Sequence, residues 1–125
     1  MTKNKLYCKV MDCYHNGDYP GAVEAYKAYI VKSKSDDPLV LSADFAHLLC
    51  LKGDYYEASK ILSRIITDLE TKEELHEAFV SACLAYAICL LNLDDYGMYC
   101  LYISKFMNLI RDSDAKTFEY LETVI

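Results

Sequence analysis

The sequence predicts an all-α protein in which antiparallel helical hairpins stack on one another, with about seven helices in a single domain spanning residues 1–125. Apolar residues recur three or four positions apart along most of the chain, which is the spacing of one helix face. No segment shows the sustained alternation of apolar and polar residues that a half-buried strand requires. A Gly-Asp-Tyr turn at Gly17 returns at Gly53 ahead of a second amphipathic run, so one hairpin pattern is written more than once.

The first hairpin, near residues 3–33, is predicted from helices near 3–15 and 19–33. Between them, Gly17 permits the positive φ that ends a helix. Pro20 falls in the first turn of the following helix, where its missing N–H is not needed.

The second hairpin, near residues 38–70, is predicted from helices near 38–51 and 55–70. Its turn contains Gly53, in the same place as Gly17 in the first hairpin. The shared turn residues predict the same helix ending in both hairpins.

The third hairpin, near residues 73–111, is predicted from helices near 73–92 and 95–111, and its turn carries Asp94 where the others carry Gly. Residues 79–93 are the most apolar stretch of the chain. We interpret them as a buried core helix, because they are shorter than the roughly 18 apolar residues of a membrane span. No membrane partner is therefore expected.

A final helix near residues 113–125 is predicted to cap the stack. Its Phe118 and Leu121 lie on one face and are expected to cover Ile103 and Phe106 of the preceding helix. This cap explains a last helix that has no hairpin partner.

The charge of the chain argues against a nucleic-acid partner. The formal net charge is −6, whereas binding to phosphates requires clustered Lys and Arg. Arg64 and Arg111 are the only arginines, and the densest basic cluster, formed by Lys3, Lys5 and Lys9, is typical of a solvated chain end.

The apolar content is high for a small monomer. Residues of the hydrophobic class make up 54% of the chain, and twelve Tyr are present without any Trp. Tyr14, Tyr55, Tyr56, Tyr99 and Tyr102 cannot all lie in the interior, and Tyr is favoured at protein interfaces. Contact with another protein or with a second copy of the chain is therefore expected.

The cysteines predict reduced thiols in a cytoplasmic protein. The chain starts without the 7 to 15 residue apolar core of a signal peptide. All six cysteines fall inside helical patterns among apolar neighbours, which favours buried thiols over a disulfide framework. They are Cys8, Cys13, Cys50, Cys83, Cys89 and Cys100.

No cofactor, metal or catalytic centre is expected. Cys8, Cys13 and His15 have spacings of five and two, and His47 with Cys50 forms one same-face pair, but no second pair completes a zinc pattern. No His is placed beside a thiol to activate it. Acidic pairs occur at turns and helix starts, where they suit the helix dipole, and the four glycines are too dispersed for a phosphate loop.

Aligning the Gly-Asp-Tyr turns also aligns the residues around them. The repeated positions are Gly17-Asp18-Tyr19 with Ala22 and Tyr26, then Ala46 with Gly53-Asp54-Tyr55 and Ala58, and then Ala87 with Asp95-Tyr96. This pattern resembles the tetratricopeptide repeat, a helix–turn–helix unit with a period near 34 residues. The resemblance covers roughly residues 3–111 and implies a short right-handed α-solenoid.

The third unit departs from the family pattern. Asp94 replaces the turn Gly, and Tyr99 replaces the expected Ala. Tyr19 and Tyr55 are 36 residues apart, whereas Tyr55 and Tyr96 are 41 residues apart. A divergent stack of helical hairpins fits the sequence equally well.

The resemblance implies a concave face, lined mainly by the first helix of each hairpin, that binds a peptide or a helix of a partner. By register its predicted residues are Tyr7, Met11, Tyr14, Ala43, His47, Cys50, Leu84, Ile88 and Leu91, with Asn4, His15, Val40 and Ser81 beside them. The lining is apolar and aromatic and lacks the Lys, Arg and Asn clamp by which one subclass of the family grips a C-terminal carboxylate. An apolar or amphipathic segment is the ligand that this lining favours. The alternative is that these residues are plain core, sealed by the last helix.

These observations predict a noncatalytic protein–protein interaction module that serves as an adaptor, a chaperone-like protein or an inhibitor. Three alternatives remain open at this point, and one of them is an enzyme or metal protein built on the cysteines. The chain could be a self-associating structural or regulatory homodimer, or an inhibitor of a host protein encoded by a virus or mobile element.

Overall fold

A computed structural model describes residues 2–34 and 36–113, and these residues form helices and turns without any strand. The α-helices are α1 (Lys3–His15), α2 (Tyr19–Val31), α3 (Pro38–Lys52), α4 (Tyr55–Glu70), α5 (His76–Asn92) and α6 (Tyr96–Ser113), and a short 3-10 helix, η1 (Glu73–Leu75), precedes α5. The all-α prediction is confirmed. The described residues hold six α-helices rather than about seven, and most of the final helix expected near 113–125 lies outside them.

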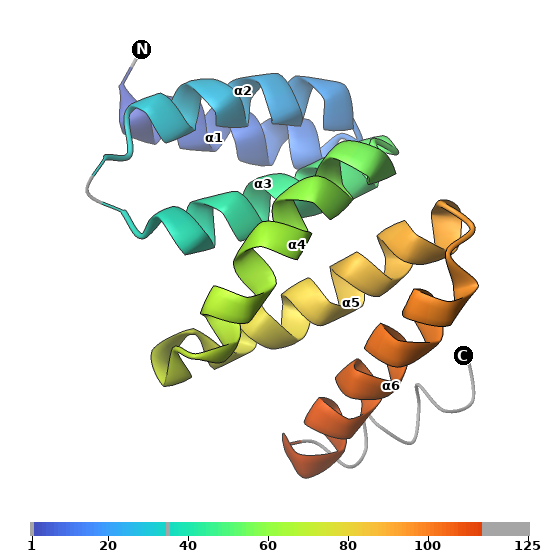
Figure 1. The fold of residues 1–125 in the computed structure, drawn as a ribbon. Helices are drawn as coiled ribbons and strands as arrows, with labels where there is room; N and C mark the ends of the chain where they lie inside the picture. Colours follow the sequence, from blue (N-terminus) through green and yellow to red (C-terminus); the bar gives the residue numbers. More distant parts are fainter. Residues whose placement is uncertain (1, 35, 114–125) are drawn as a thin grey trace.

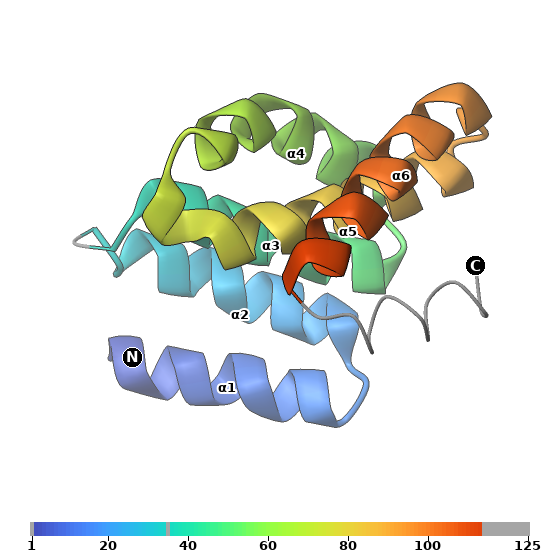
Figure 2. The same cartoon turned by 90° about the horizontal axis from the view of Figure 1, so that it is seen from below.

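The helices form three consecutive antiparallel pairs. Figure 1 shows the α1–α2 pair and the α5–α6 pair at opposite ends of the molecule, with α3 and α4 between them. Each helix packs against its neighbours in the sequence, and α3 also contacts α5 directly. Seen from below, α2 lies between α1 and α3 and holds them apart (Figure 2).

The three hairpin turns share one backbone geometry. Gly17, Gly53 and Asp94 have positive φ angles of 76°, 96° and 63°. In each turn the next backbone N–H donates to the carbonyl five residues earlier, with N···O distances of 2.8, 2.9 and 2.9 Å. This six-residue closure is the usual way to end a helix on a left-handed residue. Asp94 adopts this conformation although it is not Gly, as its place in the third turn predicted.

Four helices differ slightly from their predicted bounds: α3 ends one residue later, α6 spans Tyr96–Ser113 instead of 95–111, and the other two differ by two or three residues at one end. The helix expected near 19–33 ends at Val31, where the Ser33 hydroxyl donates to the Tyr29 carbonyl at 2.8 Å. The helix expected near 73–92 begins with the 3-10 turn, in which the Leu75 N–H donates to the Lys72 carbonyl at 3.0 Å. In both places a hydrogen bond between residues three or four positions apart takes the place of the regular helix start or end.

The alanines that recur in the hairpin pattern are buried. Ala22, Ala46, Ala58 and Ala87 are all fully buried. A short side chain allows two helix backbones to approach each other. The repeated alanines are therefore suited to close packing between the helices.

The cysteines are less uniformly buried than expected. Cys83 and Cys89 are buried, and Cys13 and Cys50 are partly buried. The prediction is wrong for Cys8 and Cys100, which are exposed. Both lie on the solvent side of an outer helix, where an apolar sequence context does not ensure burial.

The apolar segment formed by η1 and α5 is longer than residues 79–93, the most apolar stretch of the sequence. Glu73–Asn92 spans 20 residues with a mean hydropathy of 1.5, so by length and composition alone it is able to cross a membrane. Core helices of soluble proteins pass the same test. In this fold α5 packs against α3, α4 and α6. Its buried residues are Phe79, Ala82, Cys83, Ala85, Ala87, Cys89 and Leu90.

Candidate binding groove

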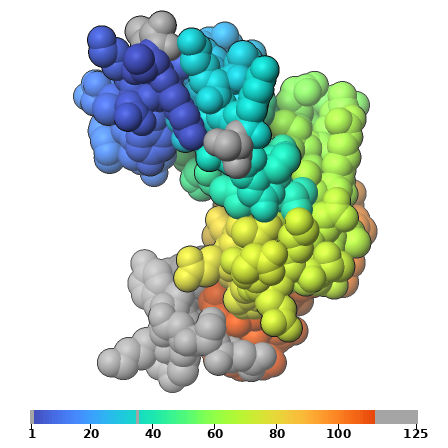
Figure 3. All heavy atoms as spheres, turned by 90° about the vertical axis from the view of Figure 1, so that its left-hand side faces the viewer, coloured from blue at the N-terminus to red at the C-terminus, as the bar shows by residue number. Residues whose placement is uncertain are grey.

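A groove runs along the first helices of the three hairpins. Figure 3 shows the side of the molecule that is hollowed between the blue residues of α1 and the yellow start of α5. Three adjacent pockets form this groove, and His47 of α3 lines all of them. We call the three pockets together the groove and name them separately below.

The aromatic pocket lies between α1 and α3, over α2, and has a volume of about 280 Å³. Its lining residues are Tyr7, Val10, Met11, Tyr14, Tyr26, Asp44, His47 and Leu48. The ring of Tyr7 contacts Tyr29 at 5.7 Å between centroids, and Tyr29 contacts Tyr26 at 5.4 Å. Tyr26 in turn stacks on Phe45 of α3 at 6.1 Å, so a chain of rings joins the first hairpin to the second.

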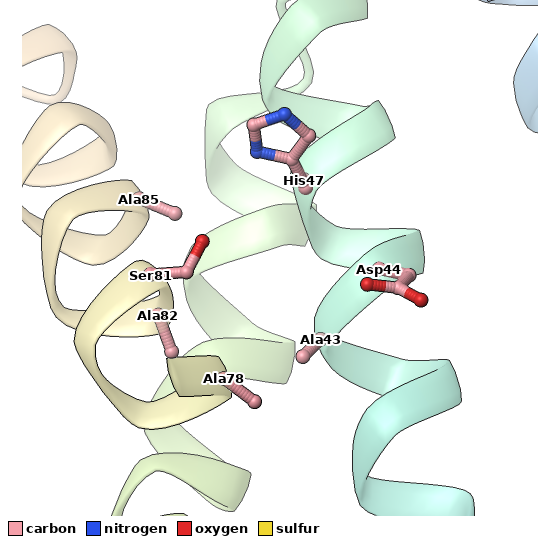
Figure 4. A pocket seen from close by; sticks show the side chains of 7 residues that line it. All are labelled: Ala43, Asp44, His47, Ala78, Ser81, Ala82 and Ala85. Atoms are coloured by element: carbon pink, nitrogen blue, oxygen red, sulfur yellow. The ribbon is translucent and has the colours of Figure 1, made fainter. Parts of the chain in front are cut away.

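The central pocket lies between α3 and α5 and is small, with a volume of about 130 Å³. Its residues are Ala43, Asp44 and His47 from α3 and Ala78, Ser81, Ala82 and Ala85 from α5 (Figure 4). The alanines leave the floor smooth. Figure 4 shows that Ser81 is directed toward His47, while Asp44 is directed away from α5 toward the aromatic pocket.

The apolar pocket continues the groove toward the ends of α3 and α5 and has a volume of about 290 Å³. Its residues are His47, Cys50, Leu51, Tyr55, Ser81, Leu84, Ala85 and Ile88. Tyr55 comes from the first turn of α4, so the aromatic residue after the second turn lines the same pocket as Leu84 and Ile88 of the third hairpin.

The structure brings together eight of the nine predicted groove residues. Tyr7, Met11 and Tyr14 line the aromatic pocket, Ala43 lines the central pocket, His47 lines all three, and Cys50, Leu84 and Ile88 line the apolar pocket. Leu91 lies one turn beyond Ile88 on α5, outside these pockets, and is 41% exposed.

Several groove residues are open to solvent. Tyr7 is 48% exposed, Tyr14 38% and Ile88 40%, although all three have apolar side chains. In the described part of the chain these residues therefore line a surface instead of filling the core. Whether residues 114–125 cover them is outside the part of the chain that the structure describes.

Nine lining residues were not predicted as part of the groove, and Asp44, Tyr26 and Tyr55 are the three of them that add polar groups to it. Asp44 lies three residues before His47, so the same i, i+3 spacing that selected His47 also carries Asp44 onto this face. Tyr26 and Tyr55 come from α2 and α4, the second helices of their hairpins, and yet they line the groove. Only the packing angle between hairpins brings them there, and no sequence signal reports that angle.

Asp44 is the charged group that the groove perturbs most clearly. Withdrawal from water raises the pKa of its carboxyl group above the ordinary value, while the charge of His47 and a hydrogen bond from the Tyr26 hydroxyl act in the opposite direction. Burial, followed by the charge of Asp44, raises the pKa of Tyr26. The aromatic pocket therefore favours a neutral or weakly polar ligand over an anion.

Ion pairs hold the helices around the groove. Lys3 at the start of α1 contacts Asp36 before α3, with an N···O distance of 2.9 Å. Lys105 of α6 contacts Glu70 at the end of α4 at 2.6 Å. Both pairs lie at the surface, where water and salt screen them, so they serve mainly to orient the helix ends.

Within residues 2–34 and 36–113 no three His, Cys, Asp or Glu side chains converge in a way that would hold a metal ion. Cys50 and Cys89 form the closest pair of such groups across two helices, with their Sγ atoms 3.2 Å apart. The groove thus offers shape, apolar area and two titratable side chains, Asp44 and His47.

Comparison with known proteins gives no relative. No protein-family description, no curated protein and no solved structure matches this chain.

Proposed function

We propose that this protein is a noncatalytic interaction module that binds an apolar or amphipathic helix of another protein in the groove. The observation that carries the proposal is the meeting of eight predicted residues, from three helices distant in the sequence, along one exposed apolar groove. An amphipathic helix that lays its apolar face into such a groove is a common mode of recognition. Adaptor, chaperone-like and inhibitor roles all use it.

The proposal includes a fold of the tetratricopeptide type, a short right-handed α-solenoid of three hairpins. The identical closure of the turns at Gly17, Gly53 and Asp94 supports it. The fully buried alanines at matching positions of the hairpins support it as well. In a solenoid, each hairpin buries its apolar face against its neighbours, which agrees with the mainly local packing of these helices.

The profile of the groove favours a helix as the ligand. The central pocket is floored by alanines, so a partner backbone can approach α3 and α5 closely there. The larger pockets on both sides present Tyr, Met, Leu and Ile side chains to apolar residues of the ligand. Met and Tyr adapt well to a range of apolar partners.

The test is a pair of double variants in the full chain. Met11→Asp with Ile88→Asp places a charge in the aromatic and in the apolar half of the groove, whereas Val31→Asp with Leu101→Asp places the same charges on α2 and α6, outside it. A partner is first captured from native cells with the wild-type chain, and its direct affinity is then measured by calorimetry. The groove variant is expected to lose at least about 100-fold in affinity, because two desolvated charges cost at least about 1.4 kcal/mol each. The control variant is expected to bind like wild type.

Circular dichroism decides whether both variants are folded. If a folded groove variant binds as tightly as wild type while the control variant does not, the outer helices are the binding surface and the groove assignment is wrong. If the groove variant unfolds and the control does not, Met11 and Ile88 are core residues, and the proposal that the groove binds a partner is wrong.

Self-association is the second candidate, and exposed apolar side chains on α6 favour it. Tyr96, Met98 and Leu101 are 58%, 38% and 59% exposed there. Sedimentation of the wild type and of Leu101→Asp over a hundredfold range of concentration separates the two functions. A dimer that Leu101→Asp dissociates would assign α6 to a subunit contact, and a monomer at all concentrations would remove this candidate.

A further inference from the structure

Two cysteines from distant parts of the chain meet beside the groove. Cys50 lies in the last turns of α3 and Cys89 in the last turns of α5, and 39 residues separate them. Their Sγ atoms are 3.2 Å apart. A disulfide bond requires about 2.05 Å, so the two sulfurs need to close by only about 1 Å.

The two thiols differ in access. Cys50 is partly buried and lines the apolar pocket together with Ile88, which is 40% exposed. Cys89 is fully buried. A small oxidant can therefore reach Cys50 from the groove, whereas it meets Cys89 only through Cys50.

The two thiols also differ in acidity, and Cys50, the more accessible thiol, is also the more acidic one. The hydrogen bond between the two thiols lowers the pKa of Cys50, and the same hydrogen bond, followed by burial, raises the pKa of Cys89. The position of Cys50 at the C-terminal end of α3 disfavours a thiolate, but the hydrogen bond is the more direct influence. Burial raises the pKa of a third cysteine, Cys83, to about 11, and this thiol has no such donor.

We propose that Cys50 and Cys89 form a peroxide-sensitive thiol pair that closes reversibly to a disulfide between α3 and α5. The Cys50 thiolate attacks one oxygen of a hydroperoxide, the O–O bond breaks, and hydroxide or alkoxide leaves as Cys50 becomes a sulfenic acid. The Cys89 sulfur then attacks the Cys50 sulfur, the S–O bond breaks, and the departing oxygen takes up the Cys89 proton as water. Two thiols are oxidised and one peroxide is reduced, and a cellular dithiol restores the pair by exchange.

The disulfide would have a defined effect on the molecule. It would join the first helices of the second and third hairpins across a loop of about 40 residues and limit their separation in the unfolded chain. It would also fix the two walls of the apolar pocket relative to each other. This proposal does not depend on the identity of any ligand of the groove.

The experiment uses the full chain, reduced and then exposed to hydrogen peroxide at a few equivalents. Free thiols are blocked with N-ethylmaleimide, and the chain is digested with trypsin and sequenced by mass spectrometry. A cross-link is expected between peptides 35–52 and 73–105, and fragmentation assigns it to Cys89 and not to Cys83 or Cys100. The thermal midpoint of the oxidised protein is expected to rise by roughly 5–10 °C and to return after reduction.

Variants distinguish the two roles. Cys89→Ala is expected to abolish the cross-link and to leave Cys50 as a sulfenic acid that dimedone traps, and Cys50→Ser is expected to abolish both products. The matched control, Cys8→Ser with Cys100→Ser, removes the two exposed thiols and is expected to keep the cross-link. Cys8 and Cys100 oxidising in wild type while Cys50 and Cys89 stay reduced would overturn the proposal. A cross-link that survives in a folded Cys50→Ser variant would overturn the proposal as well.

Discussion

At the level of single residues, Asp44 is exposed as a whole, but its carboxyl group is partly withdrawn from water at the wall of the aromatic pocket. Its carboxyl group faces the aromatic pocket, and withdrawal from water raises its pKa in the folded chain. The folded state therefore binds a proton more tightly than the unfolded state does. Stability from this group is present below the unfolded pKa and declines as the pH rises through the folded pKa.

Asp44→Asn is therefore expected to stabilise the protein at neutral pH. The gain should be about 1–2 °C in thermal midpoint, because a substitution at an accessible site changes the free energy of unfolding by about 0.5 kcal/mol or less. The difference between the variant and wild type should shrink as the pH falls through the folded pKa of Asp44 and then below 3.8, its ordinary value, because the carboxyl group is then protonated in both the folded and the unfolded chain. Thermal unfolding of both proteins across this range measures the difference, and all other carboxylates cancel.

His47 supplies a control for this prediction. Its positive charge holds down the pKa of Asp44, so His47→Gln should raise that pKa further. A carboxyl-detected NMR titration of Asp44 reads this directly. An Asp44 pKa that is unchanged in His47→Gln, together with an Asp44→Asn variant less stable than wild type at pH 7, would contradict the description of this site.

The residue-level predictions succeeded where one local rule decides the outcome. Ala58 and Ala87 recur at positions after and before the turns in the hairpin pattern, and both are fully buried. Cys8 and Cys100 were misjudged because burial depends on which helix lies opposite, and α1 and α6 each have one side without a neighbour among the described residues. Composition reports the chemistry of a side chain but not the helix that faces it.

At the level of the elements, helix ends were the most predictable feature. Residues that require or tolerate a left-handed backbone end α1, α3 and α5, and the sequence shows these residues directly. Two of the ends that were displaced, after Val31 and before His76, depend on side-chain and three-residue hydrogen bonds that have no fixed sequence signature.

The turns provide the second prediction, because equivalent positions carry Gly53 and Asp94. Gly53 has a φ of 96°, at which any L side chain is strained. Gly53→Ala should therefore lower the free energy of unfolding by about 1–2 kcal/mol. Asp94→Gly should raise it by about 0.5–1 kcal/mol, since Asp94 adopts a φ of 63° with only partial compensation from its hydrogen bond with the Tyr96 hydroxyl.

Gly97 is the matched control for these turn variants. It lies in the first turn of α6, without a positive φ, and an added Cβ meets no atom within 4 Å. Gly97→Ala should therefore be neutral or stabilising by up to about 1 kcal/mol. Urea unfolding of all three variants measures the set, and equal effects of Gly53→Ala and Gly97→Ala would disprove the role of the left-handed turn.

At the level of the whole molecule, the order of the hairpins was predictable but their separation was not. The repeated turn at Gly17 and Gly53 implies equivalent hairpins that bury their apolar faces together. The distance between α1 and α3 depends on the rings of Tyr26, Tyr29 and Phe45, which pack between the first two hairpins. This layer of rings separates α1 from α3 and so makes room for the aromatic pocket. No spacing in the sequence gives the thickness of the layer.

The last prediction concerns the distribution of stability along the stack. Among the described elements α1 packs chiefly against α2, whereas α5 packs against α3, α4 and α6. Only Leu6 and Val10 of α1 are buried. Local opening that frees α1 should therefore cost less than opening of α5, and hydrogen exchange in α1 should be at least about tenfold faster, which corresponds to about 1.4 kcal/mol.

Hydrogen exchange with mass spectrometry measures both helices in one experiment, after correction for intrinsic rates. Val10→Ala should reduce the protection of α1 by a further factor of about ten, because removing two buried methyl groups costs about 1–2 kcal/mol, and it should leave α5 nearly unchanged. Protection that falls equally in α1 and α5 would mean that the molecule opens as one cooperative unit. The unequal result would instead make the α1 wall the part of the groove that adjusts to a ligand, since the wall that opens at the lowest cost is the one that binding can order.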